Sequence, residues 1–300
     1  MRQVSRITQF NRVLMATDFS DASRNALRFA AAIARVNNAR LYIVHVISSV
    51  AYAMAPEEEV QAADLAAPLL SGLLKNLDDA GERPPVEVAL IVRQGDITAQ
   101  LDKLIREEKI DLIVVGTHGR TGFPKLTLGS VAENVFRKAS CPVLTVGPNS
   151  PADWPERELG AEKAILLATD FGDASLAALP YAASIANRSR SKLVVLHVNT
   201  PLPESPANSV FGDETVAEEL RYAAVQQLQK LLPGDLGIEP ELRVTASLPV
   251  DGILSEAAGT SAGLIVLGLH RRSHVPAGHL PSTAYGVVIQ ARCPVLTVRT

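Results

Sequence analysis

The chain has 300 residues, 47% of them hydrophobic, and its 29 Lys and Arg against 32 Asp and Glu give a formal net charge of −3. This balance excludes the strongly basic surface that is typical of nucleic-acid-binding proteins. No apolar run approaches the ~18–20 residues of a membrane-spanning helix, and the first residues lack the apolar stretch of a secretory signal, so we expect a soluble, cytoplasmic protein.

The first half of the chain alternates short apolar runs with amphipathic segments. Continuous apolar runs are typical of strands that are covered on both faces, and apolar residues at helical spacing indicate the helices between them. Ser20 is placed to cap the first helix. We expect strands over residues 12–16, 40–47, 86–92, 112–115 and 143–146, and helices over 20–33, 57–79, 97–108 and 130–138.

The second half repeats the first at a constant offset of 152 residues. Residues 14–46 and 166–198 are identical at 17 of 33 aligned positions, which indicates an internal duplication. The same order of elements is therefore expected, with strands over 163–168, 192–198, 241–245, 264–267 and 295–298, and helices over 175–187, 213–232, 251–258 and 282–290.

Alternation of strands and helices predicts an α/β fold with mostly parallel sheets. We expect two repeated doubly wound domains, each with a five-stranded parallel sheet in the strand order 3-2-1-4-5 and helices on both faces. The first domain covers residues 1–147 and the second 163–300. Residues 148–162, rich in proline at their start, form the linker.

A glycine-rich segment follows the fourth strand of the first half. Gly116-Thr117-His118-Gly119 is followed by nine residues and then by Gly129-Ser130, where the next helix begins. Glycines allow a backbone to approach a ligand closely, and a helix N-terminus favours an anion. Thr17 and Asp18 follow the first strand, at the same edge of the sheet. These features predict a nucleotide site, with an acid and a threonine for sugar hydroxyls and amides for phosphates.

The same residues also allow a purely structural interpretation. Ser130 and Glu133 fit a capping box, in which both side chains satisfy amides at the helix end. Asp18 fits a polar residue near a helix start, and glycine loops occur in this fold class without any ligand.

The combination of motifs resembles the universal stress protein family. The resemblance is carried by G-x2-G-x9-G-Ser, by residues 16–20, by residues 41–46 ending in His-Val and by residues 141–146, and it covers nearly the whole chain, once per half. It implies a tandem universal stress protein that acts as a stress-response or signalling regulator and binds ATP, with Mg²⁺ or Mn²⁺. The resemblance assigns the adenosine side to Ala16, Thr17, Asp18 and Val46, and the ribose and phosphates to Val115, Gly116, His118, Gly119, Gly129, Ser130 and Val131.

The second half departs from this pattern at two glycines. Arg271 stands where the first half has Gly119, and Pro281 stands where it has Gly129. A long side chain and a residue without an amide hydrogen remove space and one donor. We therefore expect nucleotide in the first domain only.

Ligands of the second-half loop are less well defined. Arg271 and Arg272 together could capture a smaller anion. His270, His274 and His279 match no zinc-binding spacing, so we expect no metal there.

The chain offers little catalytic machinery. It has no Walker lysine and no arranged nucleophile, so we expect no enzyme, or at most a slow ATP hydrolase. A scaffold that binds no small molecule and a flavin-binding protein of similar fold are also compatible with the residues. His45 and His197 are expected to be buried and bonded to backbone. Cys141 and Cys293 are expected to be small buried side chains rather than redox groups.

The last strand of each half is expected at a sheet edge, which must be paired or protected. The resemblance implies that residues 143–146 and 295–298 pair with each other as an internal pseudo-dimer. A homodimer of two chains is left open. No nucleic acid is expected as a partner.

Overall fold

The computed structural model describes residues 8–48, 68, 72, 86–117, 128–147, 150, 163–200, 214–270 and 283–300. The chain separates into two compact units, whose main segments are Gln9–Glu158 and Leu159–Ala291, and each is described by itself. The helix expected over 57–79 lies outside the described residues, apart from Pro68 and Gly72, which are helical. Residues 118–127 of the glycine-rich segment also lie outside them.

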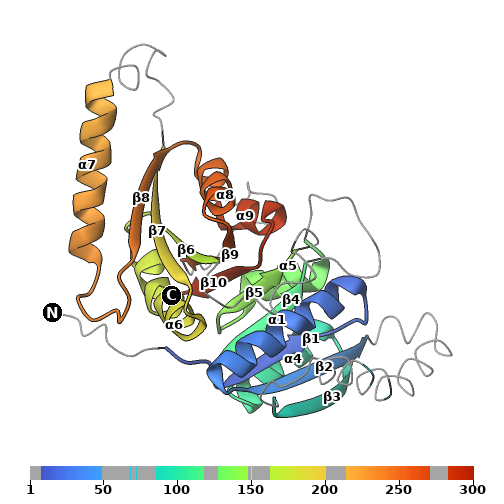
Figure 1. The fold of residues 1–300 in the computed structure, drawn as a ribbon. Coiled ribbons are helices and arrows are strands. Elements are labelled where there is room, and N and C mark those ends of the chain that lie inside the picture. The colour runs from blue at the N-terminus through green and yellow to red at the C-terminus, as the bar shows by residue number, and fades with distance from the viewer. Residues whose placement is uncertain are drawn as a thin grey trace. The chain divides into compact units, whose positions relative to one another are not determined.

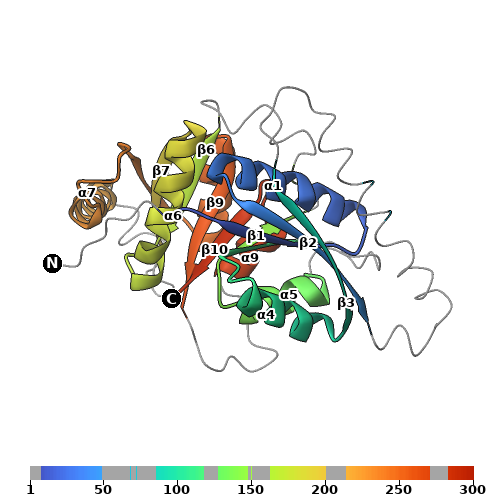
Figure 2. The ribbon, with the colours of Figure 1, turned by 90° about the horizontal axis from the view of Figure 1, so that it is seen from below.

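The first half is a five-stranded parallel sheet in the order β3-β2-β1-β4-β5. This confirms the expected strand order. Figure 2 shows α1 on one face of the sheet and α4 and α5 on the other. The elements are β1 (Arg12–Ala16), α1 (Asp21–Asn37), β2 (Arg40–Ser48), β3 (Val88–Gly95), α4 (Ile97–Glu107), β4 (Leu112–Gly116), α5 (Ser130–Lys138) and β5 (Val143–Val146).

The second half has the equivalent order, β8-β7-β6-β9-β10, and is also parallel. Figure 1 shows α6 on one face of this sheet and α8 and α9 on the other, with α7 alongside β8. The elements are β6 (Ala164–Thr169), α6 (Asp173–Ser189), β7 (Lys192–Asn199), α7 (Glu214–Leu231), β8 (Glu241–Ala246), α8 (Pro249–Gly259), β9 (Ala262–Leu269), α9 (Thr283–Gln290) and β10 (Val295–Arg299).

The central strands form the core because both of their faces are covered. Val13, Leu14 and Met15 of β1 are 0% exposed, as are Leu112 and Ile113 of β4. Such strands are continuously apolar, which is why the sequence predicts them well. Within the described parts of the chain, no helix is both long and apolar enough to span a membrane.

The start of α1 follows the sequence prediction. Ser20 is the N-cap, and its hydroxyl accepts a hydrogen bond of 3.2 Å from the Ser23 amide. Asn38 ends the helix in the left-handed conformation at φ 51°, a role that asparagine tolerates. This cap matters for function because the turn before it carries Thr17 and Asp18.

The edge strand β3 lies later in the sequence than expected. Residues 86–92 were expected, whereas the strand covers Val88–Gly95 and pairs with Leu41–Ser48 of β2. The apolar run ends at Val92, but Arg93 and Gln94 continue the strand. An edge strand is less covered than a central one, so polar side chains are tolerated there and the apolar pattern does not mark the strand's end.

Gly116 and Gly268, at equivalent positions in the two halves, allow a helix to pack on the end of a strand. A Cβ at Gly116 would lie 3.0 Å from the backbone C and O atoms of Ala22. A Cβ at Gly268 would overlap the backbone of Ala174 and Ser175. The neighbour of these glycines is therefore the first turn of α1 or α6. This packing explains why both halves keep a glycine here.

We predict that Gly268→Ala lowers the free energy of unfolding by about 3 kcal/mol, because the added methyl group must push α6 away from β9. Gly259→Ala is the matched control, since a Cβ there meets nothing within 4 Å. It is expected to stabilise the protein by roughly 0.5 kcal/mol through the unfolded chain. Urea denaturation followed by circular dichroism measures both, and equal stability of the two variants would contradict the packing role of Gly268.

Both cysteines are buried, as the sequence predicts. Cys141 is 8% exposed and Cys293 is 7% exposed, and neither forms a disulfide. Burial raises the pKa of the Cys141 thiol to about 12, which suppresses the reactive thiolate at neutral pH.

We expect the native protein to react at least 100-fold more slowly with Ellman's reagent at pH 8 than the urea-unfolded chain, which should release thionitrobenzoate from both thiols. The difference follows from burial and, for Cys141, from the raised pKa. Rapid labelling of the folded protein would instead support a redox role.

Candidate functional site

A pocket of about 150 Å³ lies at the carboxyl edge of the first sheet. It combines the ends of β1, β2 and β4 with the first turns of α4 and α5. Ligands in open parallel sheets bind at this edge, where the helices begin. The lining residues are Ala16, Thr17, Asp18, Ser23, Val44, His45, Val46, Ile97, Leu101, Val115, Gly116, Gly129, Ser130, Val131 and Ala132.

Most of the residues selected from the sequence meet in this pocket. His118 and Gly119 lie outside the described residues, and the other nine all line it. Ile97, Leu101 and Ala132 line it too, although no sequence motif pointed to them. A usable signal existed for the first two, because they are apolar residues four apart at the start of the helix that follows β3.

The N-terminus of α5 presents backbone amides to the pocket. Its first intrahelical hydrogen bond runs from the Glu133 amide to the Gly129 carbonyl, 2.8 Å away. The amides of Ser130, Val131 and Ala132 precede that bond, and no acceptor for them lies among the described residues. These donors and the positive end of the helix dipole suit an anion.

The capping box that the sequence allows at this helix is not formed. Gly129, at φ −59° and ψ 148°, is the N-cap, and no side chain bonds to the helix end there. Glu133 instead forms an ion pair with Arg137, at 2.9 Å. The structural interpretation of Ser130 and Glu133 is therefore wrong, since Ser130 begins the helix itself and is exposed.

The turn after β1 uses the hydroxyl of Thr17 internally. The Phe19 amide donates to Thr17 Oγ1 at 3.0 Å, and the hydroxyls of Thr17 and Ser23 are also 3.0 Å apart. Thr17 is 6% exposed. Its side chain holds the turn against α1, and the residue also lines the pocket.

Asp18 is a half-buried carboxylate at the pocket. Its Oδ1 accepts a hydrogen bond of 3.0 Å from the Ser20 amide. Burial by itself would raise its pKa, but hydrogen bonds from the side chain and backbone of Ser20 and from the side chain of Ser23 outweigh this effect. Together they hold the pKa of Asp18 below its ordinary value. The group is therefore ionised at neutral pH and can accept hydrogen bonds from a ligand's hydroxyl groups.

His45 is buried and bonded to backbone, as the sequence predicts. Its Nδ1 lies 2.8 Å from the Thr17 carbonyl oxygen and donates to it, because a carbonyl can only accept. The ring centroids of His45 and Phe19 are 4.6 Å apart. His197 makes the equivalent contact in the second half, with Nδ1 2.8 Å from the Thr169 carbonyl oxygen, but it is only partly buried, so the expectation of burial is wrong for this residue. Both rings thus fix the turn that follows the first strand.

A backbone hydrogen bond joins the two ends of the glycine-rich segment. The Gly129 amide donates to the Thr117 carbonyl at 2.7 Å, which ties the start of α5 to the end of β4. Pro281 stands at the equivalent position of the second half and has no amide hydrogen, so this structural hydrogen bond cannot form there. From the sequence, the amide at this position was expected to be a donor to a ligand.

In the second half, the equivalent carbonyl has a different donor. The Leu269 carbonyl accepts from the Thr300 amide at 3.1 Å, which extends the pairing of β9 and β10. Thr300 corresponds to Pro148, which has no amide hydrogen. At the helix start, the first half therefore has a donor, Gly129, and the second half has Pro281. After the last strand the order is reversed, with Pro148 in the first half and the donor Thr300 in the second.

Comparison with known proteins places both halves in one family. The model of the universal stress protein family matches residues 9–147 and 162–299. A universal stress protein of Mycolicibacterium smegmatis is 26% identical, with 96% of each chain covered. One from Methanocaldococcus jannaschii is 32% identical over 46% of this chain and 82% of its own. The crystal structure of a universal stress protein from Archaeoglobus fulgidus has the same fold, with a TM-score of 0.69, 21% identity and coverage of 97% of this chain and 99% of that one. The chain therefore belongs to the universal stress protein family, as a tandem member with two such domains.

Proposed function

We propose that the protein is a stress-response or signalling regulator that binds ATP in its first domain only. The observation that carries the proposal is the set of amides at the start of α5, which line the same pocket as the carboxylate of Asp18. The amides suit phosphate groups, and the carboxylate suits ribose hydroxyls.

The apolar part of the pocket suits a base. Val46 lies near the end of β2, and Ile97 and Leu101 belong to the first turns of α4, so the three side chains contribute an apolar part of the lining. The enclosed volume of about 150 Å³ is below the roughly 300–1,000 Å³ of most small-molecule sites. We therefore expect the base and sugar to occupy the pocket, and the triphosphate to extend along the N-terminus of α5.

A divalent ion would depend mainly on the nucleotide. Among the described residues, no group of three or more His, Cys, Asp and Glu side chains could hold a metal. Mg²⁺ is usually bound through one or two carboxylates together with substrate phosphates. Asp18 is the carboxylate among the described lining residues, so it would supply the protein's share of the ligands.

The restriction to the first domain is supported by the different partners of the two strand-end carbonyls. The hydrogen bond from the Gly129 amide holds the start of α5 beside the end of β4. Pro281, which stands at the equivalent position of the second half, has no amide hydrogen and cannot make this bond. This missing hydrogen bond supports the proposal that the second domain does not bind a triphosphate in the same way.

The first test replaces Gly129. Gly129→Pro should weaken ATP–Mg²⁺ binding at least tenfold, because α5 loses its bond to Thr117 and its amides are no longer held in place. Gly129→Ala keeps the amide and, at φ −59°, is compatible with alanine, so it should bind ATP nearly as the parent does. Isothermal titration calorimetry on the full chain measures both affinities and the stoichiometry, expected to be one ATP per chain.

A double variant tests whether ATP binding depends on the position of α5 or only on a hydrogen bond to the Thr117 carbonyl. Gly129→Pro combined with Pro148→Thr copies both residues of the second domain and offers Thr117 a new donor. We expect it to recover stability relative to the single proline variant, without recovering ATP affinity. Full ATP binding by the double variant would refute the proposed role of the Gly129 bond.

The second test copies the other substitution. Gly119→Arg should abolish ATP binding, because a long side chain would compete with the phosphates for space, while the circular dichroism spectrum stays unchanged. Equal ATP binding by this variant would refute the assignment of the glycine-rich segment to the phosphates. Two ATP molecules per chain in the parent would refute the restriction to the first domain.

A further inference from the structure

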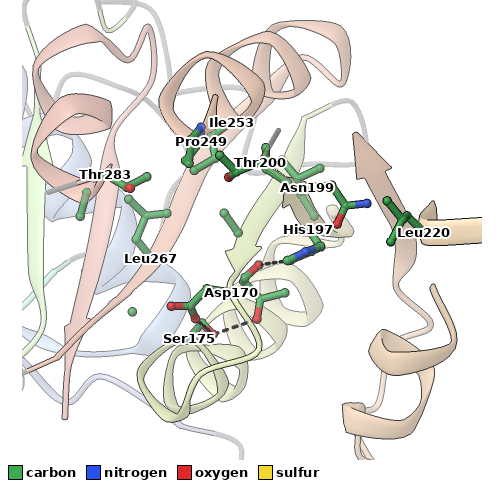
Figure 3. A pocket seen from close by; sticks show the side chains of 16 residues that line it. Asp170, Ser175, His197, Asn199, Thr200, Leu220, Pro249, Ile253, Leu267 and Thr283 are labelled. Atoms are coloured by element: carbon green, nitrogen blue, oxygen red, sulfur yellow. Dashed lines mark hydrogen bonds between the residues drawn. The ribbon is translucent and has the colours of Figure 1, made fainter. Parts of the chain in front are cut away.

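The second domain encloses a larger cavity than the first, at the same edge of its sheet. Its volume is about 680 Å³, against about 150 Å³ in the first domain. Small-molecule sites typically enclose roughly 300–1,000 Å³. Figure 3 shows Asp170 and Ser175 at one end of this cavity, and Pro249 and Ile253 at the opposite end.

The walls between these ends are mainly apolar. Leu267 of β9 and Ile253 of α8 are 5% and 4% exposed and form part of the lining. Leu220 of α7 also lines the cavity and is 42% exposed. A ligand with an apolar body would cover Leu220 and gain from the burial.

Asp170 gives the cavity a negative end. Its Oδ1 accepts hydrogen bonds of 2.9 Å from the Gly172 amide and from the Ser175 hydroxyl, which fix the carboxylate. Partial burial would raise its pKa, but these two bonds outweigh that effect, and His270 acts in the same direction as the bonds. The pKa of Asp170 is therefore below its ordinary value, and the group is ionised at neutral pH.

The described lining residues include no Lys or Arg to neutralise this carboxylate. His197, the other titratable group in the lining, has its Nδ1 bonded to the Thr169 carbonyl. The side chains of Asn199, Thr200 and Thr283 are neutral. Asp170 itself is exposed, so its carboxylate lies at the solvent-accessible edge of the cavity, where it attracts a cation and repels phosphate or carboxylate groups.

We propose that the second-domain cavity is a separate binding site for a small organic amine. The apolar body of the amine would lie among Leu220, Ile253 and Leu267, and its ammonium group would bond to Asp170. This site is independent of the proposed ATP site, because the two cavities belong to different domains and have no lining residue in common.

The test uses three probes with one body and different charges: 3-phenylpropylamine, 3-phenylpropanol and 3-phenylpropionate. Saturation-transfer NMR and calorimetry on the full chain at pH 7 should rank the amine first, the alcohol second and the carboxylate last. Asp170→Asn should weaken amine binding about tenfold, since it removes a charge-assisted hydrogen bond, and should change alcohol binding little.

Two matched variants control for folding and for non-specific charge effects. Asp173→Asn removes a carboxylate from the first turn of α6 that does not line the cavity, and it should leave amine affinity unchanged. Thr283→Trp fills the cavity from the exposed start of α9 and should abolish binding of all three probes. Circular dichroism confirms that each variant is folded.

Three results would overturn the proposal. The first is preferential binding of the carboxylate probe, which Arg271 and Arg272 would favour. The second is an amine affinity in Asp170→Asn equal to that of the parent. The third is no binding of any probe at millimolar concentration. Amine titrations repeated with saturating ATP–Mg²⁺ should give an unchanged affinity. A failure of ATP binding would leave the ranking of the three probes as it is, so the two proposals fail separately.

Discussion

The carbonyl oxygen that follows the fourth strand of the first domain belongs to a buried residue, and a buried carbonyl needs a hydrogen-bond donor. Thr117 itself is 1% exposed. The first domain supplies the donor from the start of the following helix, and the second supplies it from the residue after its last strand. A proline occupies the unused position in each case. The two substitutions therefore form a pair, since a proline at the helix start removes the hydrogen bond that the Gly129 amide donates to the Thr117 carbonyl.

What the two domains share is mostly structural. Phe19 and Phe171 both have φ 64°, a left-handed conformation that is rare for a bulky side chain. In each turn, the phenylalanine amide donates a hydrogen bond to the hydroxyl of the threonine two residues earlier. Each phenylalanine ring also lies against a histidine ring. The identity of the two copies over this segment therefore reflects a turn that is costly to form and is held by several bonds. The same turn explains why both copies keep an aspartate. Asp18 and Asp170 each accept a hydrogen bond from the backbone amide two residues later.

The fold was predictable from the sequence because the strands are buried on both faces. Apolar runs and their repetition at 152 residues define the order of the elements without any knowledge of contacts. The errors lie where long-range or competing interactions decide. The edge strand β3 continues through Arg93 and Gln94, and Gly116 is needed for a contact with Ala22, ninety-four residues earlier. Neither fact is encoded in a local pattern.

The site was predictable as a set of residues, but less so as a set of roles. Strand ends and a helix start converge at the carboxyl edge, so the pocket itself followed from topology. The role of each residue depends on which neighbouring group its hydroxyl or carboxylate forms a hydrogen bond or ion pair with. The Thr17 hydroxyl forms its hydrogen bonds within its own turn. Glu133 forms an ion pair with Arg137, one helical turn away, and does not cap the start of the helix. Several partners lie within reach of each group, and sequence spacing alone cannot rank them.

The paired substitutions also account for the chemistry of the two cavities. Where the helix start is bonded to the strand end, the pocket is small and its donors are backbone amides, which favour an anion. Where that bond is absent, the cavity is larger and the charge that remains among its described residues is the carboxylate of Asp170. The aspartate is common to both domains, so it does not by itself decide which ligand is bound. In our proposals, the sign of the preferred ligand depends on whether helix amides line the cavity together with that carboxylate, and the hydrogen bond from the Gly129 amide to the Thr117 carbonyl holds those amides in the first domain.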